Sequence, residues 1–343
     1  MKSIVIHAAR DLRIEEREAA APGPGQVAVA IKRGGICGSD LHYYQHGGFG
    51  VVRLKEPMIL GHEVAGEIVA VGEGVSGLTR SDLVAVSPSR PCGSCVYCQQ
   101  GLQMHCLEML FYGSAMRFPH VQGAFREHLI AEATQCHKLA SGIGVEAGAF
   151  AEPFAVALHA INRTGPLIGR RVLITGCGPI GALSIIAAHA HGAREIVATD
   201  VTDFTLALAR KIGADRAVNV ATDVSAMDAY KANKGTFDVM IEASGNERAL
   251  RLGLDVLRPR GILAQLGLGG EVALPQNQVV AKEIDIRGSF RFHDEFALAV
   301  DLINARRVDL SPLLTDVVPL ARAQDGFKLA SDRSRAMKVQ IAF

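Results

Sequence analysis

The sequence predicts an α/β protein in which an irregular β-rich domain accompanies a doubly wound parallel-sheet domain. In the first third of the chain, short β-rich runs alternate with turns rich in glycine and proline. From about Arg170 onward, strands alternate with helical patterns, which is typical of a parallel sheet covered by helices on both faces. A length of 343 residues also fits about two domains of ~150 residues each.

The first part of the chain is expected to be built from strands without a long amphipathic helix between them. The cluster Pro22–Gly25 predicts a turn that separates the first β ribbon from the second. The expected strands cover residues 3–7, 26–32, 63–71 and 83–87.

The second part starts with a strand over 171–175 and a helix over 180–191, followed by a strand over 195–200 and a helix over 203–212. Four further strands are expected, at 216–220, 237–243, 262–266 and 284–287. Beyond residue 290 the alternation ends, and we expect helices over 295–305 and 321–330. The last eight residues predict a strand, which we expect to return to the N-terminal part.

Composition and charge exclude several classes of partner. The 36 Lys and Arg residues nearly balance the 35 Asp and Glu residues, so no net field attracts nucleic acid or an anionic membrane. The N-terminal apolar run is too short for a signal peptide, so we expect a cytosolic protein. Residues 172–193 lack charge and are long enough to cross a bilayer of ~30 Å, but their glycines and Pro179 instead predict a strand, a turn and a helix.

A glycine-rich loop between the strand 171–175 and the following helix predicts a dinucleotide site. The first glycine allows the tight turn, the second lets the backbone approach a pyrophosphate, and the third lets the helix pack closely on the strand. The free N–H groups of the helix N-terminus can then bind the phosphates. The alternative is a strand–helix turn that binds nothing. The expected cofactor-binding residues of the loop are Gly176, Gly178, Pro179, Ile180 and Gly181.

Asp200 closes the next strand, at the ~20-residue distance where a carboxylate accepts hydrogen bonds from the adenosine ribose. It would also repel a 2′-phosphate, and no basic residue directly follows it. NAD is therefore favoured over NADP, although Arg210 and Lys211 lie further along the helix.

Four of the seven cysteines fall within fifteen residues, in the pattern Cys92-x-x-Cys95-x-x-Cys98-x7-Cys106. Thiolates at such short spacings close a tetrahedral zinc shell with no open position, which makes a structural site. The alternatives are a redox thiol pair or paired disulfides. The odd number of cysteines and the lack of a secretory signal argue against both.

A second set of metal-ligand side chains predicts an open site. Cys37 lies in a glycine-rich turn, and His62 and Glu63 follow about twenty-five residues later. Glu152 sits in the apolar run 149–155, where burial of an unpaired carboxylate is costly and a bound cation would explain it. Cys37, His62 and Glu152 would leave one position of a zinc ion free for water or substrate. Glu63 either supports these ligands from the surrounding layer or binds the ion itself.

The residues around Cys37 offer supporting groups. Asp40 is expected to hydrogen-bond the far nitrogen of His62 and fix its tautomer. Ser39 and His42 offer a path for a proton from a metal-bound hydroxyl to solvent. Taken alone, His42 is typical of a solvated loop histidine, so its role depends on the whole constellation.

With these residues in place, the chain resembles the zinc-dependent medium-chain dehydrogenases over essentially its whole length. The string Gly61-His62-Glu63-x-x-Gly66-x5-Gly72-x-x-Val75 is similar to the zinc signature of that family. Glu152 stands where many alcohol dehydrogenases carry cysteine, and this resembles the polyol dehydrogenase branch. Further segments are similar to members that oxidise sugar acids: residues 34–45, 111–116, 118–121 and 288–292.

The resemblance implies reversible hydride transfer between NAD(P) and a secondary alcohol of a polyol or aldonate, with two zinc ions per chain. It implies a GroES-like catalytic domain formed by residues 1–150 and 288–343 around a Rossmann cofactor domain of residues 151–287. It also implies a homodimer or homotetramer. The proton-relay positions fall on Ser39 and His42, and the catalytic metal ligands on Cys37, His62 and Glu152, with Glu63 as the variable member.

An aldonate carries a carboxylate, so a guanidinium is expected near the substrate. Arg117 and Arg291 are the candidates, and either could equally be a surface arginine. The alternatives within the class are a sorbitol, xylitol or threonine dehydrogenase. Outside it, the alternative is a non-catalytic protein that binds zinc and NAD.

Overall fold

The computed structural model describes residues 1–343, and its second part is a six-stranded parallel sheet in the order β15–β14–β13–β16–β17–β18. Because the order reverses between β13 and β16, the carboxyl ends of these two strands open the crevice in which such sheets bind ligands. The strands are β13 (Arg171–Thr175), β14 (Glu195–Asp200), β15 (Arg216–Asn219), β16 (Phe237–Glu242), β17 (Leu257–Gln265) and β18 (Asp285–Gly288).

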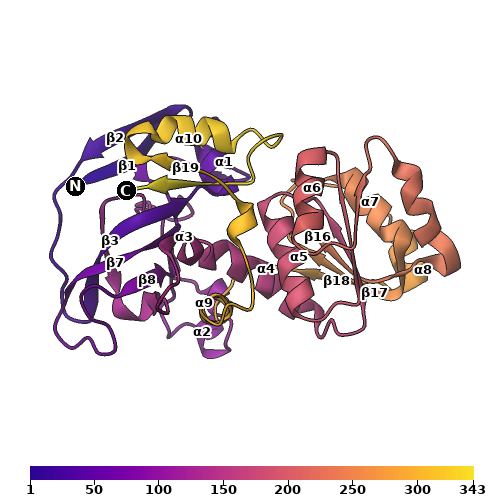
Figure 1. The fold of residues 1–343 in the computed structure, drawn as a ribbon, viewed down its shortest axis with the longest axis horizontal. Coiled ribbons are helices and arrows are strands. Elements are labelled where there is room, and N and C mark those ends of the chain that lie inside the picture. Colours follow the sequence, from indigo (N-terminus) through magenta and orange to yellow (C-terminus); the bar gives the residue numbers. More distant parts are fainter.

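Helices cover both faces of this sheet because successive strand residues point to opposite sides. Val172 and Ile174 pack into the core that contains α5 and α6, whereas Leu173 packs into a second core with α7. Figure 1 shows α5 and α6 on one side of the sheet and α7 on the other. The helices are α5 (Pro179–Ala190), α6 (Asp203–Lys211), α7 (Glu247–Val256) and α8 (Gln276–Lys282).

The other part of the molecule is β-rich and contains both chain ends (Figure 1). Its seven-stranded sheet has the order β12–β8–β7–β3–β20–β19, with β11 also paired to β3. The terminal strand β20 pairs antiparallel with β3, which confirms the predicted return of the chain. The members are β3 (Gln26–Gly35), β7 (Glu63–Val71), β8 (Leu83–Val86), β11 (His128–Glu132), β12 (Cys136–Lys138), β19 (Leu314–Pro319) and β20 (Lys338–Ala342).

Smaller sheets and short helices complete this part. One sheet joins β1 (Lys2–Ala8), β2 (Asp11–Glu16) and β6 (Met58–Ile59), and two ribbons pair β4 (Gly48–Phe49) with β5 (Val52–Arg53) and β9 (Ser89–Arg90) with β10 (Leu110–Phe111). The remaining helices are α1 (Gly38–His46), α2 (Val96–Gln99), α3 (Val145–Gly148), α4 (Ala151–Thr164), α9 (Glu295–Asn304) and α10 (Ala323–Ala330). The 3₁₀ segments are η1 (Gln103–His105), η2 (Ala133–Gln135), η3 (Val224–Lys234), η4 (Ser311–Leu313) and η5 (Leu320–Arg322).

Two helices differ from the sequence prediction. Residues 38–46 form helix α1, where a glycine-flexible turn was expected, and Asp40 stabilises its start by accepting the Cys37 N–H at 3.0 Å. Helix α4 was expected only as an apolar run. Ten of its fourteen residues are buried, so it lacks the polar face that makes a helix recognisable in a sequence.

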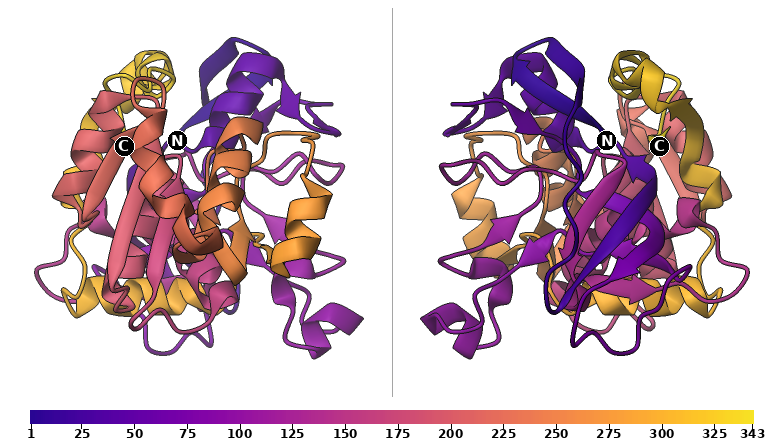
Figure 2. Two further views of the ribbon diagram at one scale, coloured as in Figure 1. Left: turned by 90° about the vertical axis from the view of Figure 1, so that its right-hand side faces the viewer. Right: turned by 90° about the vertical axis from the view of Figure 1, so that its left-hand side faces the viewer.

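Helix α4 joins the two parts through a shared core. It packs against α5 of the parallel-sheet part and against α9. Phe292, Phe296 and Val300 belong to the same buried cluster as α4 and α5. The segment around α9 therefore packs on the parallel-sheet part before the chain returns to the β-rich part. Figure 1 shows the β-rich part and the parallel-sheet part side by side, and the two views of Figure 2 look along the line that joins them, first from the parallel-sheet end and then from the β-rich end. No helix has the length and apolarity needed to cross a membrane.

Candidate active site and structural metal lobe

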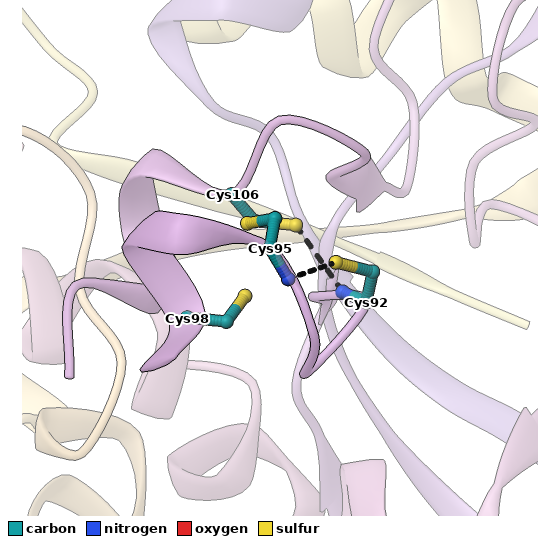
Figure 3. Close-up of side chains that lie close together, drawn as sticks. All are labelled: Cys92, Cys95, Cys98 and Cys106. Atoms are coloured by element: carbon teal, nitrogen blue, oxygen red, sulfur yellow. Dashed lines mark hydrogen bonds between the residues drawn. The ribbon is translucent and has the colours of Figure 1, made fainter. Parts of the chain in front are cut away.

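Four cysteines converge in the loop that carries α2 and η1. The sulfur atoms of Cys92, Cys95, Cys98 and Cys106 all lie within 4.8 Å of one another, and Figure 3 shows them pointing toward a common centre. Tetrahedral zinc with Zn–S bonds of about 2.3 Å needs sulfur atoms about 3.8 Å apart. The donor set therefore fits a closed metal site.

Backbone amides already favour thiolates in this lobe. The N–H groups of Cys92 and Glu108 point at the Cys106 sulfur, at 3.2 and 3.3 Å, and Cys95 N–H donates to Cys92 at 3.3 Å. Hydrogen bonds from Ser94 and Cys95 lower the pKa of Cys92 to about 6, whereas burial raises the pKa of Cys98 to about 12. A cation would be needed to ionise all four thiols together.

A second cluster lies at the base of the β-rich part, between α1 and β7. The ligand atoms of Cys37, His62 and Glu63 lie within 4.8 Å of one another. Cys37 directly precedes α1, and Glu63 begins β7. Gly35 is required opposite Glu63, since a Cβ there would collide with the Glu63 carboxylate.

Asp40 is fully buried behind this cluster, but it does not make the predicted hydrogen bond to His62. Its carboxylate lies 3.9 Å from His62 Nδ1 and accepts the N–H groups of Cys37 and Gly61 at 3.0 and 3.1 Å. It therefore joins the Cys37 and His62 segments through their backbones. His62 Nδ1 is buried without a hydrogen-bond partner, which leaves a ring nitrogen free for a metal or for Asp40.

Lys338 is the functional residue that sequence reasoning missed. Its ammonium lies 2.8 Å from both oxygens of Glu63 and both side chains are almost completely buried. Burial alone would lower the pKa of Lys338, but the charges of Glu63 and Cys37 outweigh it and raise the value. The only signal in the sequence is a lysine at the start of the short terminal strand, 275 positions from its partner.

Glu152 lies in the first turn of α4 and is 6% exposed. It does not share the 4.8 Å cluster of Cys37, His62 and Glu63. Burial raises the pKa of Glu152 to about 8; the charges of Glu63 and Cys37 add to this rise, and those of His62 and Lys338 oppose it. No side chain forms an ion pair with it. A buried carboxylate next to a thiol, an imidazole and a second carboxylate fits a divalent cation with nitrogen, sulfur and oxygen ligands.

The two predicted relay residues lie on α1, three positions apart, so they share one face of the helix. Burial raises the pKa of Cys37 to about 12, and a hydrogen bond from the Ser39 side chain acts in the opposite direction. His42 is exposed, and partial burial with the neighbouring charges of His46 and Arg333 lowers its pKa. No hydrogen bond joins Ser39 to His42.

The two candidate arginines lie in different surroundings. The Arg291 guanidinium stacks 4.2 Å from the Phe111 ring, which in turn lies 5.6 Å from the His62 ring. Burial lowers the pKa of Arg291 to about 10, and the charge of Glu152 acts in the opposite direction. Arg291 therefore borders the cluster.

Arg117 instead points to the cysteine lobe, where it pairs with Glu108 at 2.5 Å. It lines a hollow of about 460 Å³ beside Cys92 and Arg90.

The glycine loop has the backbone geometry that its sequence predicts. Gly176 has φ of +82°, and a Cβ there would collide with Ser244. Gly178 lies immediately before α5, and Pro179 and Ile180 are the first two residues of that helix. A Cβ on Gly181 would meet the Gly176 carbonyl, so α5 can approach β13 only with glycine at this position.

Asp200 is tied to the same loop. One carboxylate oxygen accepts the Cys177 N–H at 2.6 Å, and the other accepts Val201 and Thr202 N–H groups at 2.7 and 3.0 Å. The oxygen bonded to Cys177 keeps a lone pair that a ribose hydroxyl can use.

Comparison with known proteins agrees with both parts of the chain. Residues 23–141 match the family described as alcohol dehydrogenase GroES-like domain, and residues 179–305 match the family described as zinc-binding dehydrogenase.

Similar proteins extend over nearly the whole chain. L-idonate 5-dehydrogenase (NAD(P)(+)) of Escherichia coli is 44% identical over 92% of this chain and 91% of its own. The crystal structure of L-idonate 5-dehydrogenase from Escherichia coli aligns with a TM-score of 0.96 at 42% identity, covering 100% of this chain and 98% of that one. Sorbitol dehydrogenase of Bos taurus is 34% identical over 99% of this chain and 95% of its own.

Proposed function

This chain belongs to the zinc-dependent alcohol dehydrogenase family and is an NAD(P)-dependent dehydrogenase; from that premise we propose that it oxidises L-idonate reversibly to the 5-keto acid. The observation that carries the proposal is the 44% identity to the L-idonate enzyme over 92% of the chain. The position of Arg291 beside the cluster supports it, because a sugar acid brings a carboxylate that a polyol lacks.

We propose that Cys37 and His62 hold a catalytic zinc ion together with a glutamate, which is either Glu63, a member of their cluster, or the buried Glu152. A zinc ion there would lower the pKa of the substrate hydroxyl toward neutrality, as it does for water, from 15.7 to about 7. Asp40 holds the two ligand segments together. Cys92, Cys95, Cys98 and Cys106 would hold a second, structural zinc ion.

The chain's own residues supply proton transfer and orientation. Ser39 stands next to Cys37 and would take the hydroxyl proton, and His42, on the same face of α1, would pass it to solvent. Arg291 would bind the substrate carboxylate with two parallel N–H groups. Its stacking on Phe111 holds the guanidinium plane fixed.

For the cofactor, we propose NAD in preference to NADP. Support comes from Asp200, whose carboxylate faces the loop and would repel a 2′-phosphate. The residues that would bind the pyrophosphate, through close backbone approach and the N-terminus of α5, are Gly176, Gly178, Pro179, Ile180 and Gly181. The bound cofactor would supply the hydride acceptor.

We also propose a homodimer or homotetramer and a cytosolic location. Strand β18 has a partner on one side only, and its Ile286 is 41% exposed, which supports the first. All seven cysteines are free of disulfides, which is typical of a reducing compartment.

The testing experiment compares initial rates of NADH oxidation with 5-keto-D-gluconate and with fructose, before and after zinc chelation. We expect a chelator-sensitive preference for the keto acid. A preference for fructose would move the assignment to a polyol dehydrogenase, and no rate with either would leave a threonine dehydrogenase or a non-catalytic protein.

Arg291 provides the second test of the substrate class. Arg291→Ala should raise KM for L-idonate by about 10- to 100-fold, since a hydrogen bond to a charged group contributes about 1.5–3 kcal/mol, and should leave KM for sorbitol nearly unchanged. Arg117→Ala is the matched control, because its guanidinium pairs with Glu108. Equal effects of Arg291→Ala on both substrates would remove the support for an aldonate.

A further inference from the structure

A guanidinium from the β-rich part lies directly over the glycine loop of the other part. A Cβ placed on Gly178 would be 2.8 Å from the Nη1 atom of Arg333. The same charge also reaches α1, where it helps to lower the pKa of His42. Arg333 therefore stands between the glycine loop and the helix that carries the proposed proton relay.

Arg333 lies in a hydrogen-bonded turn between α10 and β20. Asp332 accepts the N–H and the hydroxyl of Ser334 at 3.0 and 2.5 Å, and its carbonyl accepts the Ala336 N–H at 3.0 Å. On the other side, Ser331 accepts a hydrogen bond from Gln45 at 2.9 Å. The turn is thus fixed to the end of α1, and its tip presents Arg333 to the loop.

The Arg333 side chain has no partner of its own. It is exposed and forms neither an ion pair nor a hydrogen bond, although acidic partners are common for arginines elsewhere in this chain. Its neighbour Arg335 differs, because the Arg335 charge acts on Asp332 and helps to lower the pKa of that carboxyl. A free guanidinium can bind an anion without first breaking an ion pair.

The glycine loop lacks the charge that a diphosphate requires. Residues 176–181 contain no lysine or arginine. Within the loop, an anion can therefore interact only with backbone N–H groups and the positive end of the α5 dipole. A guanidinium matches two phosphate oxygens with parallel N–H groups.

We propose that Arg333 binds the diphosphate of the dinucleotide cofactor and so links the two parts of the molecule across the bound cofactor. The inference rests on the proposed function, since it presumes that the glycine loop binds NAD(P). Because Arg333 comes from the β-rich part and Gly178 from the parallel-sheet part, the bound diphosphate would contact both parts of the molecule.

The experiment measures equilibrium binding to the substrate-free protein by calorimetry, with NADH, NADPH, ADP-ribose and adenosine. Arg333→Ala should weaken the binding of NADH, NADPH and ADP-ribose by about 10- to 100-fold, as expected for one charge-assisted hydrogen-bond pair. The affinity for adenosine should stay unchanged. Arg333→Lys should recover part of the loss, because it keeps the charge without the fork. Arg335→Ala, two residues away on the same turn, is the control and should bind like the wild type.

The outcomes separate this inference from the proposed function. If the wild type binds neither NADH nor NADPH, the proposed function fails. If the wild type binds but Arg333→Ala behaves like Arg335→Ala, the role of Arg333 is wrong while the function stands. A loss confined to NADPH would assign Arg333 to the 2′-phosphate, and an equal loss for adenosine would show a structural effect of the turn; both contradict the proposal.

Discussion

At the scale of single residues, Glu63 decides how charge is balanced in the proposed active site. It lies close enough to Cys37 and His62 to share a cation with them, yet Lys338 holds both of its oxygens at 2.8 Å. A buried carboxylate needs a compensating charge. Lys338 provides that charge before a metal binds, and it keeps the strand end β20 attached to the cluster.

Lys338→Met should therefore destabilise the metal-free protein strongly. Removing one partner of a buried ion pair costs about 3–5 kcal/mol, because the other charge stays buried and unpaired. Zinc should restore most of this loss, since Glu63 can then use the cation as its partner. Urea unfolding of the wild type and the variant, each with and without zinc, measures both effects.

Lys338→Arg serves as the control, because it retains the charge and should lose much less stability. If zinc leaves the deficit of Lys338→Met unchanged, Glu63 does not interact with the metal, and Glu152 is then the ligand.

His42 can be tested through its pH dependence. Partial burial and the charges of His46 and Arg333 place its pKa below the ordinary value of 6.5, so the ring is neutral and able to accept a proton above that pH. His42→Ala should slow turnover on the order of 100-fold, the lower end of what a positioned base supplies, and most at low pH, where hydroxide is too scarce to replace it.

The measurement is a pH–rate profile of His42→Ala together with its zinc content, which should stay at the wild-type value. His46→Ala, one helical turn further on, is the matched control: it should keep a rate near that of the wild type and shift the profile only slightly toward higher pH, because the His46 charge helps to lower the pKa of His42. A His42→Ala profile that coincides with the wild type would remove His42 from the mechanism.

At the scale of elements, a half-buried carboxylate adds to the apolar contact between α4 and α9. Glu295 on α9 accepts hydrogen bonds from His159 and Asn162 on α4, at 3.0 and 3.1 Å. Burial alone would raise the pKa of Glu295, but these hydrogen bonds and the charge of His159 lower it to about 2. The carboxylate thus stabilises the junction between the two parts only while it is ionised.

The sign of the pH effect follows from this lowered pKa. A carboxyl whose pKa falls on folding contributes stability that is present above its ordinary value of 4.5 and is lost as pH falls toward 2. Glu295→Gln should therefore have a lower Tm than the wild type at pH 7, and the difference should shrink between about pH 5 and pH 2. A Tm difference that is constant over this range would mean that Glu295 acts through packing alone.

The elements also show how far sequence reasoning reaches. The strands 171–175 and 195–200 were predicted at their observed limits, because fully buried parallel strands are uniform apolar runs between clear turn signals. Helices α1 and α4 were not predicted as helices, since one begins at a glycine and the other is buried nearly all round. The cysteine lobe was predicted because its ligands are local in sequence, whereas the Lys338–Glu63 pair depends on β20 returning beside β3.

At the scale of the whole molecule, the parallel sheet ends in an unprotected edge. Strand β18 has a partner on one side only, and Ile286 at its centre is 41% exposed. Several apolar side chains are exposed in the segment that leads to this strand, at Leu268, Val272, Leu274 and Val280. An unpaired sheet edge in water is a site for pairing with another chain, and the exposed Ile286 adds apolar surface to it, so we expect this edge to associate with a second copy.

The simplest association is a twofold one, in which β18 of each copy pairs antiparallel with its partner and continues the sheet through both molecules. Light scattering after size exclusion should then give twice the 36.4 kDa chain mass, or four times if dimers pair.

Ile286→Lys should shift the measured mass toward that of a single chain, because the substitution buries a charge in the contact. Ile168→Lys is the control: Ile168 is 83% exposed but lies before β13, away from this edge. A wild-type mass of one chain, or an unchanged mass in Ile286→Lys, would contradict assembly through β18.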